Sequence, residues 1–101
     1  MGQRLSLHQL LKDALGSSNV YFQPPTTTKI VYPAIVYQLD SEQVEHADNR
    51  IYSMYDRYQI TLIDPNPDTT VRKKLLEIPL TRFDRFYVSA NLNHFAFLTF
   101  F

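Results

Sequence analysis

The chain of 101 residues contains no cysteine, and this absence excludes disulfide bonds, cysteine-based zinc sites and thiol catalysis. It fits an intracellular or virion protein. With only two glycines, neither a P-loop nor a dinucleotide-binding fingerprint is present. The formal net charge is zero, with ten Lys and Arg against ten Asp and Glu. Proteins whose main role is to bind nucleic acid usually carry a basic excess, so the charge balance disfavours that class.

Patterns for catalysis and for membrane insertion are also missing from the sequence. The three histidines, His8, His46 and His94, lie far apart and show no metal-ligand spacing. No serine lies in a G-x-S-x-G elbow, and the first residues include no apolar stretch long enough for a signal peptide or a membrane span. We therefore predict no catalytic, cofactor-binding or metal-binding residue, no cofactor and no membrane partner.

The chain does contain enough apolar residues for one domain spanning 1–101, since 45% are hydrophobic and 14% aromatic. Its longest strand-like run is Tyr52 to Ile63, in which Tyr58, Ile60 and Leu62 share one face. Twelve extended residues span about 40 Å. This is long for a small domain, so the pattern predicts that one end continues beyond the sheet as part of a hairpin arm.

Two short helices are predicted, at Leu5 to Leu15 and at Thr70 to Glu77. In the first, Ser6 and Gln9 have the spacing of a capping box, and Gly16 is placed to end the helix. Its apolar residues recur at the spacing of one helical face: Leu7, Leu10, Leu11, Ala14 and Leu15. The second helix follows the run Asp64 to Asp68, DPNPD, in which Asp68, or the next residue, Thr69, is the predicted cap.

The remaining segments are extended. Lys29 to Leu39 is rich in β-branched residues, and Pro33 within it predicts an edge position or a bulge. Residues 40–50 are polar and predict an exposed hairpin arm that turns at 47–49. The other predicted strands are Asn19 to Gln23, Arg82 to Ser89 and His94 to Phe101. The result is an α+β fold of order α-β-β-β-α-β-β, with a mainly antiparallel sheet, two flanking helices and an arm around 40–52.

Three features leave alternatives for function open. The carboxylates of Asp64 and Asp68 could pair with those of the arm for acid–base chemistry, although a proline-stiffened turn explains the run better. The segments 55–58 and 82–87 interleave arginines with aromatic rings, as RNA-binding sheets do, but Asp56 and Asp84 favour local ion pairs instead. The apolar segment 94–101 needs cover from the helices or from a neighbouring subunit.

Several motifs together resemble a family of small phage proteins. They are YPAIVY at 32–37, ADNRIY at 47–52, RYQITLIDPNPD at 57–68, FDRFY at 83–87 and NLNH at 91–94. With this spacing, residues 20–101 are similar to the tail-completion, tail-terminator or head–tail joining proteins of long-tailed phages and prophages of Gram-positive bacteria.

The resemblance implies a non-enzymatic virion protein at the head–tail junction, made in the host cytoplasm. It implies a homo-oligomeric ring, expected to be a hexamer, that caps the tail tube protein and meets the head connector or stopper protein. It also allows contact with DNA that passes through the lumen. A head-side connector or stopper of the same neck is the first alternative, and a small nucleic-acid-binding module is the second.

Ring contacts require two different complementary patches on each subunit. Our candidates are the polar arm and the apolar terminal strand. The residues that we expect at these subunit or partner contacts are Asp48, Asn49, Arg50, Arg57, Arg85, Phe97 and Phe101.

Overall fold

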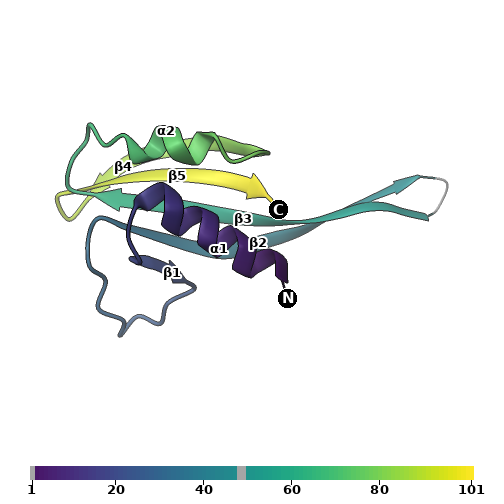
Figure 1. The fold of residues 1–101 in the computed structure, drawn as a ribbon, viewed down its shortest axis with the longest axis horizontal. Helices are drawn as coiled ribbons and strands as arrows, with labels where there is room; N and C mark the ends of the chain where they lie inside the picture. Colours follow the sequence, from purple (N-terminus) through teal and green to yellow (C-terminus); the bar gives the residue numbers. More distant parts are fainter. Residues whose placement is uncertain (1, 48–49) are drawn as a thin grey trace.

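The structure is a computed structural model that describes the backbone of residues 2–47 and 50–101 and the side chains of residues 4–40 and 56–101. The predicted fold class and element order are confirmed (Figure 1). The elements are α1 (Gly2–Leu15), β1 (Val20–Phe22), β2 (Ala34–Ala47), β3 (Arg50–Asp64), α2 (Val71–Leu76), β4 (Thr81–Ser89) and β5 (Leu92–Phe100).

The five strands form one mixed sheet in the order β1-β2-β3-β5-β4. Only β1 and β2 are parallel, and the other three pairs are antiparallel. β5, the last strand in the sequence, therefore lies inside the sheet between β3 and β4. The two edge strands are β1, with three residues, and β4, with nine.

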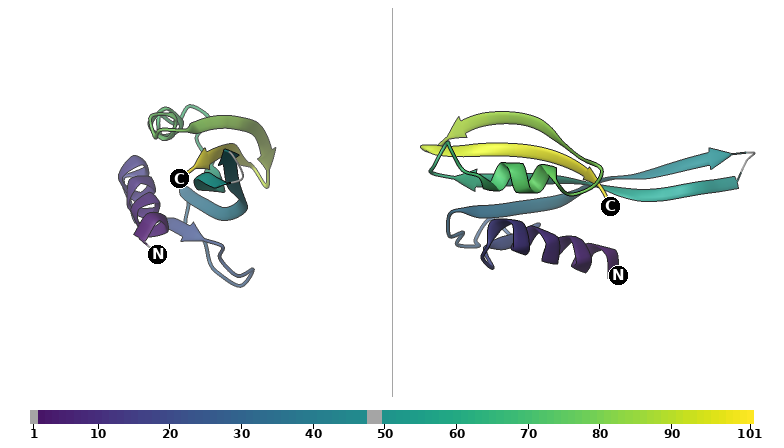
Figure 2. Two further views of the ribbon diagram at one scale, coloured as in Figure 1. Left: turned by 90° about the vertical axis from the view of Figure 1, so that its right-hand side faces the viewer. Right: turned by 45° about the horizontal axis from the view of Figure 1, so that its top comes forward.

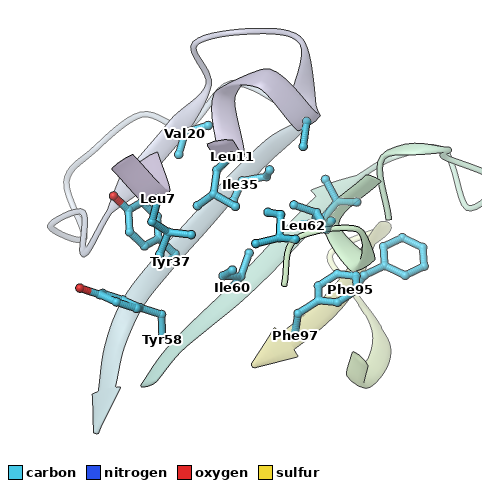
Figure 3. Packing of buried hydrophobic residues seen from close by; sticks show 13 residues of the cluster. Leu7, Leu11, Val20, Ile35, Tyr37, Tyr58, Ile60, Leu62, Phe95 and Phe97 are labelled. Atoms are coloured by element: carbon cyan, nitrogen blue, oxygen red, sulfur yellow. The ribbon is translucent and has the colours of Figure 1, made fainter. Parts of the chain in front are cut away.

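The core lies on one face of this sheet, beneath both helices (Figures 2 and 3). Cross-strand neighbours continue this face from β2 through β3 to β5, because Tyr37 pairs with Ile60 and Ile60 with Phe97. All three residues are buried, as the period of two in the sequence predicts. The helices complete the core with Leu7, Leu11, Ala14, Leu75 and Ile78.

The first helix is longer than the sequence predicts. It begins at Gly2, so Ser6 and Gln9 lie inside it and the predicted capping box is wrong. The Gln9 amide instead donates to the Asp13 carboxylate one turn later, at 3.0 Å. Gly16 ends the helix as predicted: its φ is +80°, and its N–H donates to the Lys12 carbonyl at 2.8 Å.

The second strand begins later than the sequence predicts. β2 starts at Ala34, and Pro33 precedes it, so the predicted start at Lys29 and the edge or bulge position of Pro33 are wrong. β2 is an interior strand between β1 and β3 at its start, where the pairing with both neighbours uses backbone N–H groups. Proline has no N–H, so it occupies the position just before the ladder rather than one within it.

The DPNPD run forms the predicted turn. The Asn66 N–H donates to the Asp64 carboxylate at 2.8 Å, and the Asp68 N–H donates to the Asn66 side chain at 3.0 Å. The Thr69 hydroxyl then accepts the N–H of Val71, the first residue of α2, at 3.2 Å. The N-cap position is Thr70, which makes no side-chain cap bond, so the predicted cap at Asp68 or Thr69 is wrong by position, although Thr69 still bonds the first residue of the helix.

Candidate assembly surfaces

The predicted hairpin arm is present and extends well past the rest of the sheet (Figure 1). Pairing of β1 with β2 ends at Tyr37, and pairing of β5 with β3 ends at Arg57. The β2–β3 ladder continues alone from Glu42 opposite Asp56 to Ala47 opposite Arg50. Within the described backbone, no third strand pairs with this part. A two-stranded ribbon is only marginally stable alone, so the arm is suited to a surface supplied by another molecule.

An ion pair holds the base of the arm. A register shift between Leu39 and Ser41 sets Asp40 apart as a bulge in β2. The Asp40 carboxylate lies 2.7 Å from the Arg57 guanidinium Nε on the neighbouring strand. Both side chains remain about one third exposed, at 33% and 34%, so the pair contributes roughly 0.2–1 kcal/mol. Arg57, predicted to meet a partner, thus has a partner in its own chain, and this partner is not the adjacent Asp56.

The edge strand β4 presents a row of half-exposed apolar side chains. The Phe83 ring packs edge-on against Phe97, with centroids 5.6 Å apart, and the Phe86 ring packs against Phe95 at 5.0 Å. Each of these two rings packs against a buried residue of β5 and remains about half exposed to solvent. The exposed fractions are large for apolar residues: Phe83 45%, Phe86 48%, Tyr87 43% and Val88 61%.

A bulge in β4 explains why this row was missed in the sequence. Phe83 and Phe86 are three residues apart, so a regular strand would place them on opposite faces. The register shifts between Phe83 and Arg85, which leaves Asp84 as the extra residue. Phe83 then pairs with Phe97, and Phe86 pairs with Phe95, on the same face. The uncovered apolar surface was instead predicted on the terminal segment 94–101, which has little polar face.

Basic side chains surround the β4 edge. Arg85 is exposed, and its Nε lies 3.2 Å from the carboxylate of the adjacent Asp84. This is the local ion pair that the sequence predicts, and it leaves 65% of the Arg85 side chain exposed. Other exposed basic residues on β4 and on the preceding helix are Arg82, Arg72, Lys73 and Lys74.

A polar cluster joins α1 to the sheet. The Tyr37 hydroxyl accepts from the Arg4 guanidinium at 3.3 Å and lies 2.8 Å from His8 Nδ1. Because the Tyr37 oxygen already accepts a hydrogen bond from Arg4, the Tyr37 hydroxyl can donate its own proton to Nδ1 of a neutral His8 ring. Burial first, and then the charges of Lys12 and Arg4, lower the pKa of His8. Burial raises the pKa of Tyr37, against an opposing effect of Arg4. The cluster therefore anchors the helix and carries no obvious reacting group.

The predicted contact residues do not form one group. Asp48 and Asn49 lie outside the described residues, and Arg50 is described only as the first backbone residue of β3. The prediction for Phe97 is wrong for the folded chain, because its ring is fully buried in the chain's own core. Phe101 is partly buried against the core, and its N–H donates to the Asp56 carbonyl at 3.0 Å, near the base of the arm. Arg85 lies on β4, at the far edge of the sheet.

Among the described residues, no three His, Asp or Glu side chains gather as a metal site would require. The helices described here include none long and apolar enough to cross a membrane.

The chain was also compared with known proteins. No family model matches it, and neither does any curated protein. Its surfaces are therefore the basis for any functional conclusion.

Proposed function

We propose that the chain is a structural virion subunit that forms a ring at the end of a phage tail and joins the tail to the head. The observation that carries the proposal is the β2–β3 arm, which extends past the sheet without a third strand among the described residues. The molecule measures 50 × 26 × 23 Å, so the arm gives it a reach about twice its width. Such a reach allows a subunit of a closed ring to contact its neighbour.

Two unlike surfaces on one chain also support a ring. In a ring, each subunit uses one patch toward the preceding copy and a different patch toward the next. The arm continues β2 and β3, whereas the apolar row lies on β4 at the sheet edge. Similar surfaces would serve a head-side stopper, which remains the alternative in the same class.

The nucleic-acid-binding alternative gains less from the surfaces. Arg57 is paired with Asp40 and Arg85 with Asp84, so two of the three guanidinium groups in the interleaved segments 55–58 and 82–87 have a carboxylate beside them, and the third, Arg82, is exposed. Absence of salt-dependent binding to DNA or RNA at low ionic strength would remove this alternative.

The test is electron microscopy of a lysate in which the gene is blocked by a stop codon at Tyr21, compared with a lysate in which a suppressor restores tyrosine. Separate DNA-filled heads beside tails of abnormal or variable length are the expected result. Leaky or empty heads beside tails of normal length would assign the chain to the head side. Normal infectious particles would refute a role at the junction.

A further inference from the structure

We infer that the β2 side of the arm adds as an extra strand to the β4 edge of a second copy of the same chain. This inference deepens the proposed function and rests on it for its biological setting, but it concerns a contact that purified protein can test. It follows from three independent features: the unpaired backbone edges, the charges and the uncovered apolar row.

The backbone edges match in kind and length. An edge strand presents unpaired N–H and C=O groups that another strand can pair with. Of the two sheet edges, β1 offers only three residues, whereas β4 offers nine. The outer side of β2 is free of β1 beyond Tyr37, so alternate residues of 40–47 present their N–H and C=O groups outward for a new ladder.

The charges of the two segments are opposite and equal. Residues 40–47 contain three acidic residues and no Lys or Arg, which gives a formal charge of −3 with His46 neutral. The unit from α2 to the end of β4, residues 71–89, contains five basic and two acidic residues, which gives +3. The other free side of the arm, residues 50–56, contains Arg50 and Asp56 and is neutral. Charge complementarity therefore selects the β2 side.

The apolar row explains what the contact would bury. Phe83, Phe86 and Val88 are each about half exposed, and a strand added beside β4 would bring side chains of its own over them. A small monomer rarely leaves such a row uncovered. The charged residues Arg82 and Arg85 and the bulge at Asp84 interrupt the edge, which discourages unspecific strand addition and favours an acidic strand.

Because the natural chain has no cysteine, single introduced cysteines report on one contact each. The experiment mixes a Gln43→Cys chain with a Ser89→Cys chain at high concentration and adds a short bifunctional maleimide. We expect a cross-linked dimer of the two chains at a yield roughly tenfold above that of a Gln43→Cys and Ser18→Cys mixture. Ser18 is exposed in the turn between α1 and β1, outside both segments. Equal yields in the two mixtures would overturn the inference.

A charge exchange tests the same contact in a second way. Glu42→Lys with Glu45→Lys in the arm chain should lower the yield about tenfold, and Arg82→Glu with Arg85→Glu in the other chain should restore it. Lys29→Glu, at an exposed loop position, is the control reversal and should leave the yield unchanged. Failure of the exchange to restore the yield would refute the assigned pairing.

The two proposals can fail separately. Cross-linking beside normal particles in the blocked lysate would leave the self-association standing and remove the phage role. Defective particles without cross-linking would retain the phage role and remove this contact. Urea unfolding of each variant confirms that it is folded before the mixtures are compared.

Discussion

Substitution of two aromatic residues on neighbouring strands should distinguish an effect on stability from an effect on self-association. Phe97 of β5 is fully buried, whereas Phe86 of β4 is 48% exposed, although both take part in the same ladder of rings. We predict that Phe97→Ala mainly lowers the stability of the chain and that Phe86→Ala mainly lowers its self-association.

The magnitudes follow from burial. Truncation of a fully buried phenylalanine costs about 3–5 kcal/mol, because the lost transfer energy adds to that of the cavity. Phe86 has about half its surface buried, which is worth about 1 kcal/mol, and its ring pair with Phe95 adds about 0.5–1 kcal/mol. With a urea dependence of about 1.5 kcal/mol per molar, the unfolding midpoint should fall by about 2–3 M for Phe97→Ala and about 1 M for Phe86→Ala.

The assay is urea unfolding followed by circular dichroism, together with the maleimide cross-linking described above. Phe86→Ala in the Ser89→Cys chain should reduce the cross-link yield severalfold while the chain remains folded. Phe97→Ala, studied without urea, should retain most of the yield. Equal shifts of the two unfolding midpoints, or loss of cross-linking only in the Phe97 variant, would refute the assignment of one ring to the core and the other to the surface.

Three further predictions concern the arm base, the helix anchor and the β4–β5 turn. A double-mutant cycle with Asp40→Asn and Arg57→Gln should give a coupling of about 0.2–1 kcal/mol that falls with added salt, and a coupling insensitive to salt would contradict an exposed pair. The pKa of His8 is lowered in the folded chain, so the unfolded chain binds the proton more tightly. The stability that the neutral His8 contributes is therefore complete above pH 6.5 and is lost as the pH falls through 6.5 toward the folded-state pKa. His8→Gln should therefore show a smaller loss of stability between pH 7.5 and 5, and identical pH profiles for the two chains would count against this role. Ala90 has a φ of +53°, which asparagine tolerates better, so Ala90→Asn should raise the free energy of unfolding by about 0.5–1 kcal/mol; a decrease in thermal melting temperature would contradict this.

The sequence predicted those elements whose pattern is regular. The alternation over Tyr52 to Ile63 correctly gave the strand, its burial at Tyr58, Ile60 and Leu62, and its extension into an arm, because a period of two is a direct result of strand geometry. Gly16 likewise marked the end of α1 through its own conformational freedom. In each case the structure depends on residues that are close in the sequence, so the sequence pattern predicts it.

The predictions failed where contacts between residues far apart in the sequence determine the local structure. The pairing of β4 with β5 sets the bulge at Asp84, and no local pattern indicates that Phe83 and Phe86 share a face. The ion pair of Arg57 depends on a bulge in another strand, which brings Asp40 within reach in place of the adjacent Asp56. Phe97 was expected at a partner surface because the terminal segment has little polar face, but two helices and β4 cover its ring.

The interior position of β5 has a consequence for how the chain is made. Translation releases β3 and β4 before β5, so β3 can pair with β2 on one side, but its other side and all of β4 remain unpaired until β5 is made. At about 5–20 residues per second, 101 residues take about 5–20 s to synthesise, and during most of this time the sheet has no bridge between its two halves. Closure of the sheet must therefore follow synthesis of β5, and a nascent chain stopped at Asn91 will expose the unbridged edges of β3 and β4 to chaperones or to other nascent copies.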